Sequence, residues 1–176
     1  YATLEAAYAA AVDEDTIVLL ADAELTNTLV ITKDITLDLN GHTISKNSEV
    51  INVDGGKLEV IGTGTIKELT PDTAGIRVIG GEDENETEYS SLKIGAGVTI
   101  EAWAPVFVAP KKVGSSYKLY AYGIAVEVSG TLISKKDSGN GAGSAIYING
   151  NIKNLKNYPV INVKDGAVLN GDDTGI

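Results

Sequence analysis

Short stretches in which apolar and polar residues alternate recur along almost the whole chain. The clearest are residues 37–44, 58–66, 92–100, 124–133 and 161–169, and each has a glycine near its middle. One apolar residue in every two is typical of a β-strand with one buried and one exposed face. A glycine between two such strands is typical of a turn. Each stretch therefore predicts two short strands joined by a turn.

A further short apolar strand precedes each of these pairs. These strands are residues 29–31, 51–53, 76–78, 106–108 and 146–148. The three strands recur in the same order, while the connections between them vary in length, which is typical of a solenoid. No helical pattern separates the strands, as a βαβ sheet would require, and sandwiches built from hairpins show no three-strand recurrence. We predict an all-β fold, a right-handed parallel β-helix with three sheets.

In such a coil, equivalent residues of successive turns form ladders about 4.8 Å apart. The predicted inward ladder of the first strands is Ile51, Ile76, Val106 and Ile146. The predicted inward ladder of the second strands is Leu37, Leu58, Leu92, Ile124 and Ile161. On the outward side of the first strands, Arg77, Phe107 and Tyr147 are expected on consecutive coils.

Residues 1–12 follow a different pattern. Apolar residues with helical spacing in an Ala-rich segment predict an amphipathic helix; they are Leu4, Ala7, Tyr8 and Ala11. We expect this helix to cap the open end of the coil. The whole chain is predicted to be one β-helix domain, with about five coils in residues 13–176. Because residues 174–176 resemble residues 74–76, the chain is expected to stop as a further coil begins.

Composition and charge exclude several function classes. The 176 residues include 14 basic and 24 acidic side chains, for a net charge of −10, with no Cys and a single His, His42. Without Cys there are no disulfides, zinc fingers or thiol nucleophiles. His42 alone does not provide a transition-metal site, and we expect no metal or cofactor. The acidic balance argues against nucleic acid as a partner, and the absence of a long apolar run argues against membrane insertion.

Residues 29–45 carry a family resemblance. Their sequence, LVITKDITLDLNGHTIS, preceded by the helix and IVLLAD, resembles the opening coils of pectate-lyase-like (pectin lyase-like) parallel β-helix modules of large Gram-positive surface proteins. The resemblance is closest over residues 1–66 and continues as a looser pattern to Ile176. It implies an extracellular module, secreted or attached to the cell wall of a bacterium, within a larger surface protein. It does not imply one activity, because this coil serves lyases, hydrolases, adhesins and stalks.

A polysaccharide lyase or glycoside hydrolase would need clustered carboxylates on the outward face. Asp38 and Glu59 are predicted neighbours on the second strands. Arg77, the only arginine, has Asn52 and Phe107 as its predicted neighbours. Acidic residues are common on half-exposed strands. We therefore predict no catalytic residue and keep an enzyme as the alternative function, with a passive structural stalk as another.

Three long insertions fall between first and second strands, at residues 80–91, 109–123 and 149–159. We expect them to stack at one corner of the β-helix. The first contains Glu82, Asp83, Glu84, Glu86 and Glu88. The second contains Lys111, Lys112, Lys118, Tyr117, Tyr120 and Tyr122. The opposite charges could screen each other, or the loops could form a recognition surface; the acidic run lacks the spacing of a dedicated calcium loop.

These observations predict a ligand-binding site at that corner and on the adjoining first strands. Its residues are Arg77, Phe107, Tyr117, Tyr120, Tyr122, Tyr147 and Trp103. Arginine and aromatic residues are enriched in binding hot spots, and Trp103 could stack on a sugar or cover the core. The predicted function is adhesin-type binding of a host glycoprotein or a polysaccharide. An immunoglobulin is one such glycoprotein, although no motif points to it.

Overall fold

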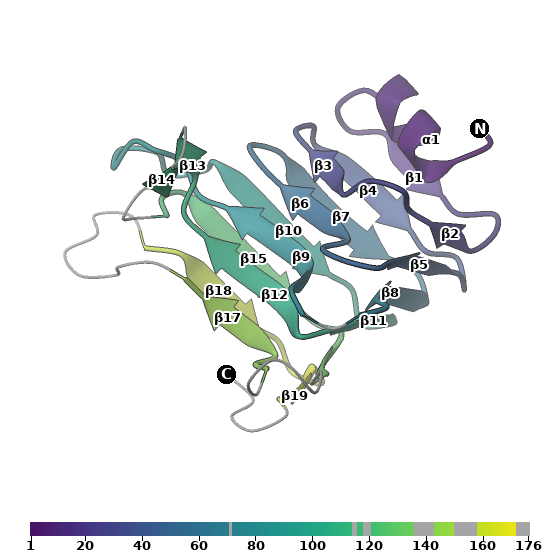
Figure 1. Cartoon of the computed structure of the whole chain (residues 1–176). Helices are drawn as coiled ribbons and strands as arrows, with labels where there is room; N and C mark the ends of the chain where they lie inside the picture. The colour runs from purple at the N-terminus through teal and green to yellow at the C-terminus, as the bar shows by residue number, and fades with distance from the viewer. Residues whose placement is uncertain (71, 114–115, 118–120, 136–142, 150–157, 172–176) are drawn as a thin grey trace.

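A computed structural model describes residues 1–70, 72–113, 116–117, 121–135, 143–149 and 158–171. Its strands form three entirely parallel sheets and one small antiparallel hairpin, and the described residues contain one short helix, α1 (Leu4–Ala10) (Figure 1). The chain visits the three sheets in turn, so each coil adds one strand to each sheet. The fold is a right-handed parallel β-helix, and the predicted fold class is confirmed.

The three sheets are named A, B and C in the order in which the chain first reaches them. Sheet A contains β1 (Thr16–Val18), β4 (Ile35–Asp38), β7 (Lys57–Ile61), β10 (Ser90–Ile94), β15 (Ile124–Val128) and β18 (Val160–Val163). Sheet B contains β2 (Ala23–Glu24), β5 (Thr43–Lys46), β8 (Gly64–Glu68), β11 (Val98–Ala102), β16 (Thr131–Ser134) and β19 (Val168–Asn170). Sheet C contains β3 (Leu29–Ile31), β6 (Ile51–Val53), β9 (Ala74–Ile79), β12 (Ala104–Ala109) and β17 (Ile146–Ile148). The hairpin pairs β13 (Lys112–Val113) with β14 (Ser116–Tyr117).

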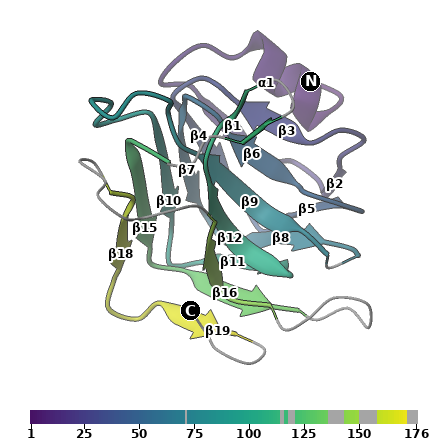
Figure 2. The same ribbon diagram turned by 60° about the vertical axis from the view of Figure 1, so that its left-hand side comes forward.

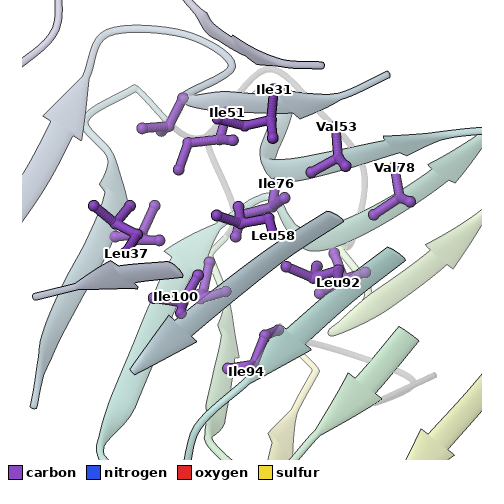
Figure 3. Close-up of a cluster of buried hydrophobic side chains, with 14 of the residues drawn as sticks. Ile31, Leu37, Ile51, Val53, Leu58, Ile76, Val78, Leu92, Ile94 and Ile100 are labelled. Carbon is purple, nitrogen blue, oxygen red and sulfur yellow. The ribbon is translucent and has the colours of Figure 1, made fainter. Parts of the chain in front are cut away.

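The three sheets enclose a continuous apolar core (Figure 2). In sheet C, Ile51, Ile76, Val106 and Ile146 pair in register on successive coils, and each is at most 4% exposed. Figure 3 shows Ile51 and Ile76 among these buried side chains. The predicted ladder of the first strands is therefore confirmed. Burying each such side chain stabilises the fold by about 1.5–3 kcal/mol relative to leaving it exposed.

In sheet A the predicted ladder is wrong at two coils. Leu37 pairs with Val60 instead of Leu58, and Leu92 pairs with Val126 instead of Ile124. Both errors are shifts of two residues. Side chains on a strand alternate with a period of two, so such a shift keeps every apolar residue on the buried face and leaves the apolar pattern unchanged. The sequence identified the buried face correctly but could not fix the register.

Helix α1 lies at the end of the solenoid formed by the first coil (Figure 1). The Thr3 hydroxyl caps its start by accepting a hydrogen bond from the Ala6 N–H at 3.2 Å. The Lys33 ammonium donates to the carbonyls of Tyr8 at 3.1 Å and Ala11 at 2.6 Å, at the end of the helix. A cation near a helix C-terminus satisfies its free carbonyls and interacts favourably with the helix dipole. The C-terminal end of the helix is therefore fixed to the connection between β3 and β4.

The corners of the β-helix differ in length. Between β4 and β5 the chain turns tightly at Asn40 and Gly41, with φ of 47° and 86°, a conformation that both residue types tolerate. The insertions lie at the corner where the chain passes from sheet C to sheet A. The first two are adjacent as predicted, because the Gly81 N–H donates to the Tyr122 carbonyl at 2.9 Å. Most of the third, residues 150–157, lies outside the described residues.

Candidate functional site

The outward face of sheet C brings together four of the predicted site residues. Arg77 on β9, Phe107 on β12 and Tyr147 on β17 pair in register at the same outward position of three consecutive coils. Trp103 lies between β11 and β12, and its ring centroid is 5.5 Å from that of Tyr147. We name these four residues the aromatic row. The parallel register alone places Arg77, Phe107 and Tyr147 next to one another, because equivalent residues of neighbouring parallel strands lie side by side.

Side chains within the aromatic row stack on one another. The Arg77 guanidinium carbon is 4.5 Å from the Phe107 ring centroid, and the Phe107 and Tyr147 centroids are 5.0 Å apart. Arg77 and Tyr147 thus cover opposite faces of Phe107, which is 9% exposed, whereas Tyr147 is 38% exposed. Such stacked and cation–π contacts contribute roughly 0.5–1.5 kcal/mol each. Tyr147 and Trp103 therefore supply the accessible surface, and Phe107 supports them.

Polar groups flank the aromatic row at Arg77. Glu49, just before β6, accepts a hydrogen bond from Arg77 Nε and forms an ion pair with it. Asn52 is the neighbour of Arg77 on β6, as predicted, and its Oδ1 is buried without a hydrogen-bond partner among the described residues. An unsatisfied buried acceptor is costly.

Glu68 holds the backbone on which Trp103 sits. Its carboxylate is 2% exposed and accepts hydrogen bonds from the Trp103 N–H at 3.2 Å and the Thr73 N–H at 2.9 Å. Burial raises the pKa of the Glu68 carboxyl, and the hydrogen bonds from Thr73 and Trp103 oppose that rise. The Ser134 hydroxyl donates to the Trp103 carbonyl at 2.9 Å. The corner between sheets B and C is thereby fixed on both sides of Trp103.

A second polar cluster lies at the corner between sheets C and A. The Tyr89 hydroxyl donates to Asp54 Oδ1 at 2.7 Å and accepts from the Lys111 ammonium, which lies 3.4 Å from the same Asp54 oxygen. Burial raises the pKa of Tyr89, and the hydrogen bond to Tyr89 raises the pKa of Lys111. We name these three residues the corner cluster. They come from three consecutive coils, so the cluster ties the bases of the first two insertions to the turn after β6.

Close backbone contact joins the same two insertions at Gly123. The N–H groups of Tyr89 and Ser90 both donate to the Gly123 carbonyl, at 2.7 and 3.0 Å. Gly123 has a φ of 64°, and a Cβ there would lie 2.7 Å from the Tyr89 nitrogen. Only glycine fits this conformation and this separation without displacing its neighbour. The base of the corner is thus set by backbone contacts as well as by side chains.

The predicted tyrosines of the second insertion do not join the aromatic row as a group. Tyr117 lies on β14, where its backbone pairs with Lys112. Tyr120 lies outside the described residues. Tyr122 is half-buried, and its backbone pairs with Gly81 of the first insertion. Of these three, the structure therefore ties Tyr122 to the corner.

Sheet A does not contain the predicted carboxylate pair. Asp38 pairs with Ile61, while Glu59 lies between Thr36 and Lys93. The prediction was wrong because β4 is shifted by two residues relative to the register expected from the sequence. The outward neighbours of Glu59 are therefore a hydroxyl group and an ammonium group.

A shallow groove of about 290 Å³ does lie on the outward face of sheet A. Its charged lining residues are Glu14, Asp34, Lys57, Glu59 and Lys93. Lys57 binds Asp34 through its ammonium group at 3.2 Å and its backbone N–H at 3.1 Å. The hydrogen bond with Asp34 raises the pKa of Lys57. One carboxylate of the groove is thus already bound to a lysine.

Comparison of the chain with family models, with curated proteins and with solved structures found no match. Within the described ranges, no three His, Asp or Glu side chains gather as a metal site. The helix in the described part of the chain is too short to cross a membrane. Function is therefore argued from the geometry of this chain alone.

Sequence reasoning missed Glu49, Glu68 and Tyr89. A signal for Glu68 exists, because it follows Ile66 by two residues and alternation places both on the buried side of β8. An acidic residue at an apolar position predicts a buried, hydrogen-bonded carboxylate. Glu49 contacts Arg77, and Tyr89 contacts Lys111, on other coils. The local sequence pattern does not predict such contacts between coils.

Proposed function

We propose that this chain is a binding module of the adhesin type that recognises carbohydrate, free or carried by a host glycoprotein, through the outward face of sheet C and the adjoining corner. Its parent is a secreted or wall-attached surface protein of a Gram-positive bacterium, and the module is of the pectate-lyase-like kind that residues 29–45 resemble. The ligand reaches Tyr147 and Trp103 first.

The observation that carries this proposal is the gathering of Arg77, Phe107, Tyr147 and Trp103 on one face. Arginine, tyrosine and tryptophan dominate binding hot spots, because they combine a large apolar surface with hydrogen-bonding groups. These four are held by strands and by Glu68, so little side-chain entropy is lost when a ligand binds. Such a surface suits a sugar, whose apolar ring faces pack on aromatic side chains while its hydroxyls bond to polar neighbours.

Sugar hydroxyls would find hydrogen-bond partners beside the aromatic row. The guanidinium N–H groups of Arg77 that do not bind Glu49 are donors there, and the Tyr147 hydroxyl can both donate and accept. The aromatic row and the polar groups that flank it together span four consecutive coils of sheet C. An elongated ligand lying across the strands would contact all of them, whereas a single sugar would contact only one or two.

The alternative function, a polysaccharide lyase or hydrolase, draws on the groove of sheet A. That groove contains carboxylates and lysines, which are the groups that proton abstraction or glycoside cleavage would use. Incubation of the chain with acidic polysaccharides and Ca²⁺ tests this directly. An increase in ultraviolet absorbance from unsaturated products, lost on Glu59→Gln, would favour the enzyme over the binding module.

A glycan array probed with the labelled chain tests the proposed function. We expect binding to a restricted set of glycans, and we expect the double substitution Trp103→Ala with Tyr147→Ser to weaken it at least about tenfold, as loss of two hot-spot side chains implies. Tyr158→Ser is the matched control, because Tyr158 is 51% exposed but lies beside β18 in sheet A. Binding that survives the double substitution would overturn the site. Binding to no glycan and no glycoprotein would favour the passive stalk.

A further inference from the structure

The end of the solenoid that carries α1 contains a cavity that the proposed function does not use. It measures about 460 Å³ and lies between α1 and residues 15–24 of the first coil. Strand β1 is the edge of sheet A, with β4 on one side and no strand of the described residues on the other. Figure 1 shows α1, β1 and β2 together at this end. The cavity therefore adjoins an open sheet edge.

Backbone groups of β1 are available at this edge. The Leu19 N–H donates to the Asp38 carbonyl next to β1, at 2.9 Å. Successive N–H groups of a strand point in opposite directions, so the Val18 N–H points away from β4 and toward the open side. An open edge of this kind is a template for pairing with a further strand.

The cavity combines an apolar wall with an apolar rim. Leu4, Ile17 and Leu19 line it and are at most 9% exposed. Leu20 and Tyr1, which also line it, are 86% and 90% exposed. A volume of this size is within the usual range of ligand sites, roughly 300–1,000 Å³. Apolar side chains of a bound segment could thus pack against the buried wall and be covered by the exposed apolar residues of the rim.

The charges that line the cavity favour a positively charged ligand. Every charged side chain that lines it is acidic, namely Glu5, Asp15, Asp22 and Glu24. Of the basic side chains nearby, His42 Nδ1 lies 3.4 Å from Asp22 Oδ1, and the Lys33 ammonium is bound to the carbonyls at the end of α1. A one-signed lining attracts ligands of opposite charge and repels a second copy of the same surface.

We propose that this end of the solenoid binds an extended, positively charged segment of a partner protein, which adds to the open edge of β1 as a further strand. Its main chain pairs with the edge at Val18, its alternate apolar side chains enter the cavity, and its Lys or Arg side chains face Glu5, Asp22 and Glu24. Strand addition derives affinity from main-chain hydrogen bonds and specificity from alternate side chains. The proposal does not depend on glycan binding at sheet C.

Fluorescence anisotropy with synthetic peptides tests the proposal on the whole chain. The probe is a labelled peptide of alternating lysine and valine, and we expect saturable binding that weakens as salt is added. The same peptide with glutamate in place of lysine should not bind. The lysine–valine peptide with alternate N-methylated amides should bind at least about tenfold more weakly, since it cannot pair as a strand. Absence of binding, or equal binding of the three peptides, would overturn the proposal.

Val18→Pro tests the edge itself. It removes the outward N–H of β1 but none of its bonds to β4, and proline is tolerated on edge strands where the N–H faces outward. We expect at least about tenfold weaker peptide binding. Val30→Pro is the matched control, because the Leu29 N–H donates to Val50 and the Val30 N–H therefore faces the open edge of sheet C, away from this cavity. Unchanged binding to a folded Val18→Pro chain would contradict strand addition.

Charge is tested by combining Glu5→Gln with Glu24→Gln. Glutamine keeps an acceptor for the Thr26 N–H, which Glu5 binds at 3.3 Å. We expect about fivefold weaker peptide binding, the combined effect of two rim charges. Glu59→Gln with Asp165→Asn removes the same charge on exposed residues elsewhere and should leave binding unchanged. Equal losses of peptide binding in the two double variants would contradict a role for the charges of the cavity. Self-association of the chain that Val18→Pro abolishes would count against a separate cationic partner.

Discussion

The outward faces of sheets A and C come from strands of the same coils, yet they differ in how much of them reaches water. At the centre of sheet A, Glu59 and Lys93 stand exposed on adjacent coils. At the equivalent place on sheet C, Phe107 is 9% exposed and Ile79 is 8% exposed. Both belong to a small apolar cluster separate from the main core, with Tyr89 and Trp103 packed against it. The outward face of sheet C is thus partly covered, at β9 and β12, by an apolar cluster of its own.

The two sheets therefore differ in what holds their outward side chains in place. On sheet A the outward charged groups are more accessible to water, and the side chains of the Lys164–Glu127 ion pair are 48% and 36% exposed. On sheet C the outward groups are held by Glu49, Glu68 and the stacked rings. A preorganised surface loses less entropy on binding, which is why the binding proposal is made for sheet C.

Phe107→Ala should have the largest effect on stability. Removing a ring buried between Arg77 and Tyr147 should lower the free energy of unfolding by about 3 kcal/mol. Lys93→Ala, at an exposed position of sheet A, should change it by less than about 0.5 kcal/mol. Urea denaturation of both variants gives the comparison. Similar values for the two would mean that sheet C has no second apolar layer.

Arg77→Met should rank second. It leaves the mostly buried Glu49 carboxylate without its partner, and we expect a loss of about 2 kcal/mol in the free energy of unfolding. Adding Glu49→Gln should recover at least half of that loss, since the unpaired charge is removed. The matched change on sheet A is Lys164→Met beside Glu127, where an exposed pair should contribute less than about 0.5–1 kcal/mol. A double variant no more stable than Arg77→Met would contradict the pairing.

A smaller, pH-dependent effect should come from Glu68. Burial raises the pKa of this carboxyl above its ordinary value of 4.5, so the folded chain keeps the proton to higher pH than the unfolded chain. The stability associated with the protonated form is therefore present below pH 4.5 and is lost as pH rises through the raised pKa. Glu68→Gln stays neutral throughout.

Urea denaturation at a series of pH values should reveal this difference. The unfolding free energy of the parent minus that of Glu68→Gln should fall with rising pH in that interval and level off above it. A difference that rose with pH would mean that the hydrogen bonds from Thr73 and Trp103 outweigh burial. Glycan binding of the same variant would then show how far Trp103 depends on this support.

Much of the fold could be predicted, because each coil repeats the same local pattern. Alternation placed Ile76 inward and Arg77 outward, and stacking of coils then placed Phe107 and Tyr147 next to Arg77. The three strand residues of the aromatic row are therefore a direct product of the repeat. In sheet A the same alternation could not separate registers two residues apart, and Asp38 was assigned the wrong neighbour.

The contacts that hold the site together could not be predicted in the same way. Glu49 reaches Arg77, and Lys111 reaches Tyr89, from different coils and from connections of irregular length. Their distances depend on loop conformation, for which the period of the strands carries no information. The exception is Glu68, whose inward position in β8 was visible in the alternation.

The stacked, parallel arrangement of the coils has a mechanical consequence. The hydrogen bonds of all three sheets connect each coil to the next, so they run along the long axis of the solenoid. A force that pulled the first coil away from the last would load these bonds end-on, one coil at a time, instead of shearing many together. The chain would lengthen in steps, each releasing one coil, and the stack of Arg77, Phe107 and Tyr147 would strengthen the steps that separate β9, β12 and β17. Under tension, the coils that carry the face proposed to hold the ligand would separate from one another less readily than the coils before them.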